Sequence, residues 1–318
     1  MKTITLLLPT VLLLVAGCKT TETRSRPISW KQQQAYLAKG EDPRVFGLGI
    51  YDTPAGPQIR GGGRLHPSQA DAFPMMTKKE HPLRPVVGMV GNFGMEWPVL
   101  LDVTSSRTWL EFDAAKKLRA RPVGEQGKAS LIRQSNDEIE ASLSLVTVIR
   151  LGQVHIENPL VYVRMADGPL GSLARGIVNP QPKGIIGWNL LKKMEQIHLF
   201  YSLKQVALFT TEPYEPNPAQ VIAALPLVEH AGVCAVRGMV DGKESLILID
   251  PAGEFEVAAP GAAAISLIDL GNVKIRAPIM SESPGGIRIG AQVLRQFDIT
   301  ICPKAGMLYL EKLAVAKK

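Results

Sequence analysis

The sequence predicts an all-β fold built from two related halves, and three observations predict it. Strand–turn–strand patterns run over residues 88–102 and 238–250, and each ends in an aspartate after leucine and β-branched residues. Residues 184–209 parallel residues 286–312, since both give an apolar residue and a glycine, a short helix-like stretch and then a hairpin. TEPYEPNPAQ, at 211–220, contains three prolines and predicts a linker between the halves.

The first half is the longer one. About 85 residues separate Asp102 from Gly187, whereas about 40 separate Asp250 from Gly290. The first half therefore carries an insertion that the second lacks. The insertion includes the stretch from Pro122 to Ile149, which contains the turn sequence SNDE.

The N-terminus predicts export. MKTITLLLPTVLLLVAGC has one lysine, then an apolar run too short to span a bilayer, then small residues, so 1–17 is interpreted as a signal peptide. The ending Val15-Ala16-Gly17-Cys18 resembles the lipobox of bacterial lipoproteins, which implies a lipid on Cys18; the alternative is a plain secretory signal with a chance cysteine. Residues 18–85 would form a tether and an N-terminal arm.

A lipid on Cys18 would hold the folded part at a membrane surface. Lys19, directly after the cysteine, gives no inner-membrane retention signal, so we expect the periplasmic face of the outer membrane. No later segment is long and apolar enough to span a membrane. Of the remaining cysteines, Cys234 and Cys302 are open to two interpretations: a disulfide, or two buried thiols.

Composition and charge favour a two-domain protein without a nucleic-acid partner. A chain of 318 residues with 46% apolar content can bury more than one core. The formal charge of +7 falls to +6 when the signal is removed with Lys2. The basic residues are dispersed, which favours a solvated surface near anionic lipid over a nucleic-acid interface.

The layout resembles the aspartic peptidases of the pepsin and retropepsin type over about Val86 to Lys312. Lobes of that family each show a strand ending in Asp-Thr-Gly-Ser/Ala and, later, an apolar-apolar-glycine motif followed by a short helix. The segments that carry the resemblance are LLDVTSSRTWLEFDAAKKL and GIIGWNLL in the first half, and LILIDPAGEF, IRIGAQVLRQFDITI and MLYLEK in the second. The resemblance implies a bilobal fold with two related β-barrel-like lobes, 86–210 and 221–318. It also implies that the longer insertion could supply a single flap over the cleft, and Pro122 to Ile149 is its most flap-like stretch.

The resemblance also implies a catalytic pair, Asp102 and Asp250, one from each lobe. Two close carboxylates cannot both ionise easily, so they share a proton. The ionised member activates water and the protonated member donates to the amide carbonyl. No cofactor or metal is required, and Gly187 and Gly290 of the apolar-apolar-glycine motifs would support the pair.

Both aspartate loops depart from the family pattern. Asp102-Val103-Thr104 and Asp250-Pro251-Ala252 replace Asp-Thr-Gly, so a Cβ stands where glycine relaxes the turn. Neither Val103 nor Pro251 has the hydroxyl that ties one loop to the other. Ser105 and Ser106 keep hydroxyls that could bond to the Asp102 carboxylate, and Gly253, arriving one place late, could shift the second turn.

Other chemistries are not indicated. The five histidines are scattered without metal-ligand spacing, and no Gly-x-Ser-x-Gly, Walker loop or Cys-x-x-Cys occurs. Two hypotheses follow: an aspartic endopeptidase acting on envelope peptides, or a non-catalytic relative that binds a peptide or protein partner by sheet-edge pairing. A purely structural role in the envelope is a third alternative.

Overall fold

The computed structural model describes residues 25–51, 58–76, 83–91, 94–132, 139–177, 179–262, 264–283 and 285–314. The protein is mostly β, with 46% strand and 13% helix. This composition confirms the all-β prediction.

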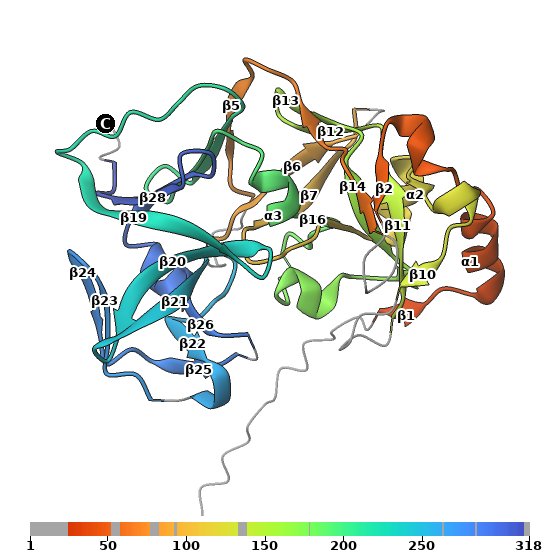
Figure 1. The fold of residues 1–318 in the computed structure, drawn as a ribbon. Helices are drawn as coiled ribbons and strands as arrows, with labels where there is room; N and C mark the ends of the chain where they lie inside the picture. Colours follow the sequence, from red (N-terminus) through yellow and green to blue (C-terminus); the bar gives the residue numbers. More distant parts are fainter. Residues whose placement is uncertain are drawn as a thin grey trace, which may run out of the picture.

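Two large sheets carry the architecture, one for each side of the molecule in Figure 1. Among the described residues, the first has eleven strands, in the order β10 (Leu131–Ile132), β11 (Ala141–Leu145), β14 (Leu160–Arg164), β8 (Trp109–Leu110), β16 (Gly184–Gly187), β7 (Glu96–Asp102), β6 (Val86–Val90), β12 (Val148–Leu151), β13 (Val154–Glu157) and β4 (Arg64–Leu65), with β9 (Arg121–Pro122) on β11.

The second sheet has thirteen described strands. Their order is β25 (Met280–Glu282), β22 (Val257–Ala259), β26 (Ile287–Gly290), β21 (Lys243–Asp250), β20 (Val233–Val240), β19 (Val221–His230), β28 (Met307–Glu311), β27 (Asp298–Cys302), β17 (Gln196–Phe200), β18 (Gln205–Phe209) and β5 (Ala70–Pro74), with β23 (Leu267–Leu270) on β20 and β24 (Val273–Arg276) on β23. This sheet takes β5, β17 and β18 from the first half of the chain, so it joins the two halves.

The smaller elements lie mainly at the outer end of the first half. Two short ribbons pair β1 (Arg26–Pro27) with β15 (Ala166–Asp167) and β2 (Gly49–Tyr51) with β3 (Gln58–Arg60). The helices are α1 (Trp30–Leu37), α2 (Phe112–Lys117), α3 (Trp188–Leu191) and α4 (Ala291–Leu294), and 3-10 turns occupy Pro43–Phe46, Glu125–Gly127, Gly171–Ala174 and Pro260–Ala262.

The internal repeat predicted from the sequence appears in the strand pairing. In the first half, β7 is antiparallel to β6 and parallel to β16; in the second, β21 is antiparallel to β20 and parallel to β26. A four-residue helix and an antiparallel hairpin follow in both, α3 with β17–β18 and α4 with β27–β28. Each half thus repeats one pattern of elements around its aspartate-bearing strand.

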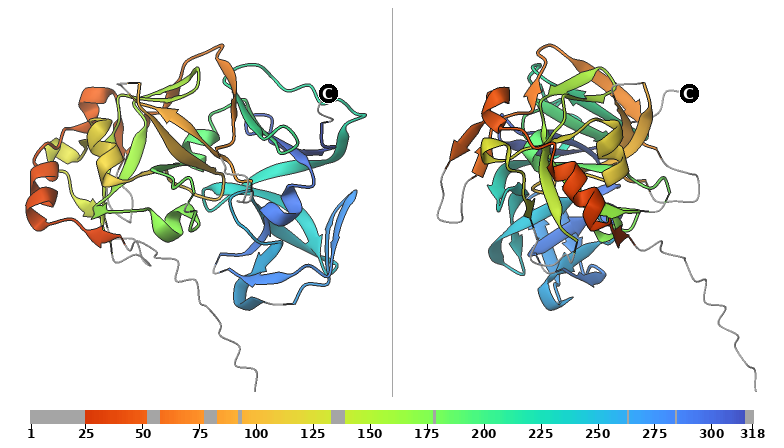
Figure 2. Two further views of the ribbon diagram at one scale, coloured as in Figure 1. Left: turned by 180° about the vertical axis from the view of Figure 1, so that it is seen from behind. Right: turned by 90° about the vertical axis from the view of Figure 1, so that its right-hand side faces the viewer.

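One apolar core runs through both halves. It contains fully buried residues of the first half, such as Trp188, and of the second, such as Ile249 and Leu308. Strand β17 pairs with β27 across the boundary, and the Cys234 backbone N–H donates to the Val103 carbonyl at 3.0 Å. The left view in Figure 2 shows the two sheets side by side. The halves are therefore joined by main-chain hydrogen bonds as well as by packing.

The N-terminal arm is built onto the first half. Helix α1 begins at the Ser29 N-cap, where Ser29 and Gln32 form a reciprocal capping box. Its one buried residue, Tyr36, packs edge-on against Phe112 with ring centroids 5.5 Å apart, and its hydroxyl lies 2.9 Å from that of Ser144. Strand β5 then reaches the far edge of the thirteen-stranded sheet.

The two remaining cysteines are free thiols and do not form a disulfide. Cys234 and Cys302 are both buried and unpaired. Burial raises the pKa of each thiol to about 12, so neither is a reactive thiolate. Within the described residues, no helix is long and apolar enough to cross a membrane.

The thirteen-stranded sheet contains a buried polar network around His198. The ring nitrogens of His198 lie 2.7 Å from Gln196 Oε1 and 2.9 Å from the Thr300 hydroxyl. Thr300 in turn donates to Glu311 at 2.6 Å, and the hydroxyl of Tyr214 donates to the same carboxylate. The His198 side chain is buried, with 5% of it exposed. Burial lowers the pKa of His198 to about 4.

We expect His198 to make the protein less stable in mild acid. Between its ordinary pKa of about 6.5 and its folded value of about 4, only the unfolded chain binds the proton, so the free energy of unfolding falls as the pH drops. The slope from this one group is about 1.4 kcal/mol per pH unit. Urea unfolding of the wild type and His198→Gln from pH 7 to 4 measures it. His230→Gln, an exposed histidine, is the control and should follow the wild type.

Candidate functional site: a buried acid pair bridged by arginine

Asp102 and Asp250 occupy equivalent positions in the two halves. Asp102 ends β7 and pairs in register with Gly187 of β16, while Asp250 ends β21 and pairs in register with Gly290 of β26. Their exposed fractions are 1% and 0%. Both carboxylates are therefore shielded from bulk water, and a buried charge of this kind is costly unless it has charged or hydrogen-bonding partners.

The two turns after the aspartates have the same hydrogen bonds. The N–H of Ser105 donates to the Asp102 carbonyl, and the N–H of Gly253 donates to the Asp250 carbonyl, both at 3.1 Å. The carbonyls of Ser105 and Gly253 then accept from Trp188 and Ala291, at 2.7 and 2.8 Å. The second turn is thus not shifted by Gly253.

The backbone conformation does not require glycine at the third position of either aspartate loop. Neither Thr104 nor Ala252 has a positive φ. Close approach is instead required at Gly187 and Gly290, where an added Cβ would lie 2.2 Å from the carbonyl oxygens of Arg107 and Phe255 respectively. Each of these glycines lets the loop after the aspartate pack directly onto the neighbouring strand.

Arg175 lies between the two carboxylates. Its Nε is 3.3 Å from Asp102 Oδ2 and its Nη2 is 3.5 Å from Asp250 Oδ2. One guanidinium from the first half therefore bridges aspartates from both halves. Burial alone would lower the pKa of Arg175, but the charges of Asp102 and then Asp250 raise it above its ordinary value. The arginine consequently stays protonated across the physiological range.

Each carboxylate has a further partner. Asp102 Oδ1 accepts from the N–H and the hydroxyl of Thr104, at 2.8 and 2.7 Å, and that hydroxyl accepts from Arg175 Nη2. Asp250 Oδ2 accepts from Arg288 Nη1 at 3.2 Å. Asp250 Oδ1 is buried and has no hydrogen-bond partner among the described residues. The two acids are thus held unequally.

This inequality is reflected in the titration of Asp250. Burial, and then the charge of Asp102, raises the pKa of the Asp250 carboxyl above its ordinary value, while Arg175 and Arg288 oppose the rise. Two acids whose environments differ in this way can carry different protonation states.

A second ion cluster adjoins the first. Glu254, four residues after Asp250, pairs with Arg295 and lies 3.5 Å from Arg84 Nε. Arg84 also donates to the Arg175 carbonyl at 3.3 Å and so fixes the turn that carries Arg175. Arg175 itself follows the 3-10 turn Gly171–Ala174 with a left-handed backbone, φ 56°. Four arginines and three acids meet at this boundary between the halves.

The supporting residues named from the sequence play different parts. Gly187 and Gly290 lie beside the aspartates, but the Ser105 hydroxyl donates to the Arg107 carbonyl at 2.8 Å and Ser106 is exposed. Thr104, not either serine, bonds the Asp102 carboxylate. Arg288 stands inside the apolar stretch IRIG, and a charge on a buried strand was the signal that could have found it.

Several sequence hypotheses lie partly beyond the described residues. The flap hypothesis, Pro122 to Ile149, includes 133–138, which lie outside them, as do the signal at 1–17 and Cys18. Among the described residues, no group of three or more histidine, cysteine, aspartate or glutamate side chains could hold a metal ion.

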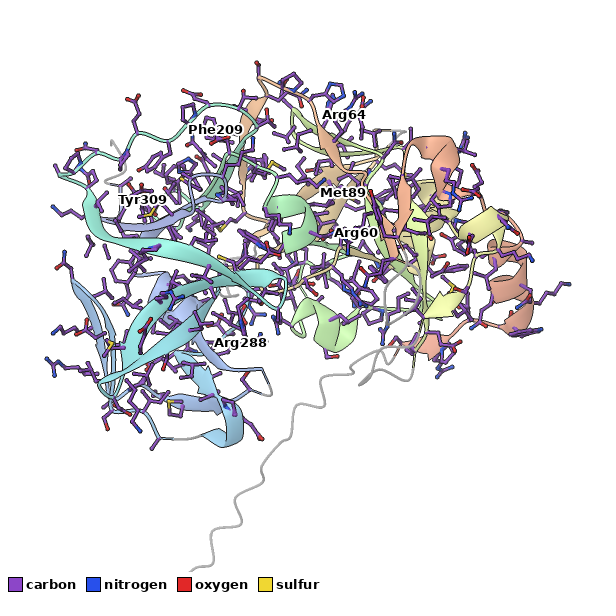
Figure 3. All side chains as sticks on the ribbon, in the orientation of Figure 1. Arg60, Arg64, Met89, Phe209, Arg288 and Tyr309 are labelled. Atoms are coloured by element: carbon purple, nitrogen blue, oxygen red, sulfur yellow. The ribbon has the colours of Figure 1, made fainter. Side chains whose placement is uncertain are left out.

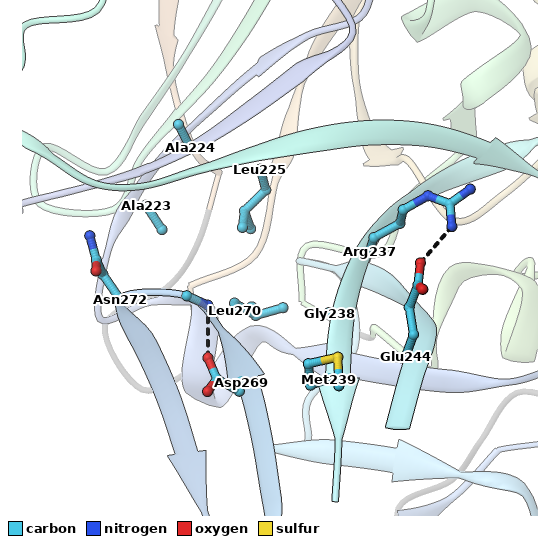
Figure 4. A pocket seen from close by; sticks show the side chains of 11 residues that line it. Ala223, Ala224, Leu225, Arg237, Gly238, Met239, Glu244, Asp269, Leu270 and Asn272 are labelled. Atoms are coloured by element: carbon cyan, nitrogen blue, oxygen red, sulfur yellow. Dashed lines mark hydrogen bonds and ion pairs between the residues drawn. The ribbon is translucent and has the colours of Figure 1, made fainter. Parts of the chain in front are cut away.

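The second half also contains an open groove, shown in Figure 4. It occurs where the edge of β20 changes partner: residues 233–236 pair with β19 and residues 239–240 with β23, leaving Arg237 and Gly238 between them. The hollow measures about 510 Å³ and has Leu225 and Leu270 in its lining. Asn272 closes one end by donating to the Ile222 carbonyl at 3.0 Å.

Comparison of the sequence with protein-family models and with curated proteins finds no match.

Replacing the bridging arginine tests its role. Arg175→Met keeps the aliphatic stem but leaves two buried carboxylates without their shared cation, so we expect a loss of about 3–5 kcal/mol in unfolding free energy at pH 7. Arg175 opposes the rise in the pKa of the Asp250 carboxyl, so its removal favours the protonated form of that group and the loss should shrink as the pH falls from 7 to 3.5. Urea unfolding at pH 7 and pH 3.5 measures both.

Arg44→Met is the matched control. Arg44 is exposed and contacts Asp42 and Glu125 on the surface, so its loss should change stability by about 1 kcal/mol or less at either pH. Equal losses of unfolding free energy from the two substitutions at pH 7 would show that the Arg175 bridge stabilises the protein no more than a surface ion pair does.

Proposed function

We propose that this protein is a catalytically inactive relative of the pepsin and retropepsin-type aspartic peptidases, exported and lipid-anchored through Cys18, that binds a peptide or protein partner. The observation that supports the proposal is the position of Arg175. An aspartic peptidase needs a water molecule and a shared proton between its carboxylates. In this chain a guanidinium contacts both carboxylates from within 3.5 Å.

In this proposal the acid pair acts as a clamp between the halves. Asp102 and Arg175 belong to the first half and Asp250 to the second, so breaking the bridge would leave buried charges uncompensated. Arg84 and Glu254 form a second pair across the same boundary. Fixing the halves in one arrangement suits a binding protein, because a preorganised surface loses less entropy when its partner binds.

The groove of the second half is the binding surface we favour. Among the described strands, none pairs with residues 223–226 of β19 on the edge opposite β28, and Arg237 and Gly238 leave a gap on β20. An extended partner segment can add main-chain hydrogen bonds at such an edge. Leu225 and Leu270 would receive one apolar side chain, and the Arg237–Glu244 pair at the rim offers both charges.

A second candidate function is peptide hydrolysis after Arg175 moves away. It is favoured by Asp250, whose pKa is raised by burial and by Asp102, and whose Oδ1 has no hydrogen-bond partner among the described residues. Such a carboxyl could serve as the protonated member of a dyad. The structural cost is the loss of both arginine–carboxylate contacts.

Peptide-library digestion separates these functions. We expect no cleavage from pH 3 to 8 by the wild type, because the Arg175 guanidinium lies between the carboxylates where a hydrolase would hold its attacking water. Each variant is first checked for a cooperative unfolding transition. Cleavage by the wild type that Asp102→Asn and Asp250→Asn each abolish would instead establish the hydrolase, whereas cleavage by Arg175→Met alone would show that Arg175 is what blocks the acid pair.

Blocking the groove tests the binding surface. Asn272 is an exposed residue in the groove lining (Figure 4), so Asn272→Arg should place a long charged side chain at the hollow without disturbing the core and should weaken binding of peptides selected from a displayed library by tenfold or more. Fluorescence anisotropy with a labelled selected peptide measures the affinity. Ala70→Arg, at an exposed position on β5 of the same sheet, is the control. Equal affinity in both variants contradicts this assignment of the surface.

A further inference from the structure

A second hollow, remote from the acid pair, is lined by basic side chains. It measures about 320 Å³ and lies between β4 with its flanking residues, the second residue after α3, the two residues after β18 and the turn between β27 and β28. Its basic residues are Arg64, His66, Lys193 and Lys304, and no acidic residue lines it. We call it the lysine pocket. In Figure 3, Arg64 lies at the upper edge of the molecule, well separated from Arg288.

The positive charge in the lysine pocket is only partly compensated. Arg64 and His66 share one carboxylate, that of Glu157, and Lys304 pairs with Glu195 at 3.0 Å. Lys193 makes no ion pair within the part of the chain that the structure describes; its Nζ donates to the Gly62 carbonyl at 2.7 Å. Burial, and then the charge of Lys192, lowers the pKa of Lys193. An anion placed beside Lys193 would relieve this unfavourable charge.

The pocket also has free donors and little steric obstruction. Lys193 uses one of its three N–H groups on Gly62, and the Thr211 hydroxyl accepts from the Ser68 N–H and so keeps its own proton to donate. The adjacent glycines, Gly62 and Gly63, have φ of 72° and 64° and bring the loop close to the lysine. A Cβ at Gly63 would lie 3.7 Å from Lys193 Nζ.

We propose that the lysine pocket binds the phosphate monoester group of a soluble metabolite or of a lipid headgroup. Lysines from two walls, with Arg64 and His66 at the entrance, match the double charge and the several acceptor oxygens of such a group. A neighbouring hollow of about 410 Å³ shares His66 but includes Glu157, which would repel a second phosphate. The site therefore takes one phosphate, and it is independent of the function proposed for the acid pair.

Binding of inorganic phosphate tests the site. Calorimetric titration of the full protein at low ionic strength should show saturable binding that sodium chloride of equal ionic strength does not reproduce. Lys193→Met and Lys304→Gln should each weaken binding about tenfold, as expected for one charge-assisted hydrogen bond. Lys193→Arg, which keeps the charge, should restore most of the affinity. Lys243→Gln, at an exposed lysine away from the pocket, is the control and should match the wild type.

The source of the phosphate is decided by two further probes. Competition by glucose 6-phosphate indicates a soluble ligand, and lysine-dependent binding to vesicles with phosphatidic acid, but not to phosphatidylcholine vesicles, indicates a lipid headgroup. If Lys193→Met does not fold, Lys304→Gln and Lys193→Arg still carry the comparison. Phosphate binding that is absent, or that is equal in all variants, overturns the proposal.

Discussion

One positive charge on Arg175 lies between two buried carboxylates that come from opposite halves of the chain. Its contacts, 3.3 Å to Asp102 and 3.5 Å to Asp250, compensate charges that have almost no access to water. Ionised groups buried without a partner cost several kcal/mol, whereas exposed pairs contribute about 1 kcal/mol or less. The relative placement of the halves, and the compensation of both buried negative charges, therefore depend on this arginine more than on any surface ion pair.

The duplicated backbone explains why the two acids come so near the same guanidinium. Each follows a strand that runs parallel to a glycine-ended strand, and each is followed by a turn with the same pair of main-chain hydrogen bonds. The backbone thus brings the two aspartates to equivalent positions although the residues after them differ, Val103-Thr104 in one half and Pro251-Ala252 in the other. The side chains around the two acids differ: Thr104 donates to Asp102 and Arg288 donates to Asp250, while Arg175 contacts both.

The groove of the second half and the lysine pocket both arise where neighbouring strands or segments diverge. The groove exists because β19 leaves β20 at Pro226, which has no N–H to continue the ladder, before β23 joins at Met239. The lysine pocket exists where the N-terminal arm crosses the boundary between the halves. Neither surface involves the acid pair, so a ligand can bind at either one while Arg175 bridges the two aspartates.

The sequence by itself determined the all-β class, the internal repeat and the equivalence of Asp102 with Asp250, because alternating apolar strands, hairpin turns and glycine positions are encoded locally. Only the tertiary structure decided which charges meet at those aspartates. Arg175 lies 73 residues from Asp102 and 75 from Asp250, at the end of a short 3-10 turn with no sequence signature of its own. Such long-range contacts depend on how the insertion folds back onto the boundary, and no local pattern records that path.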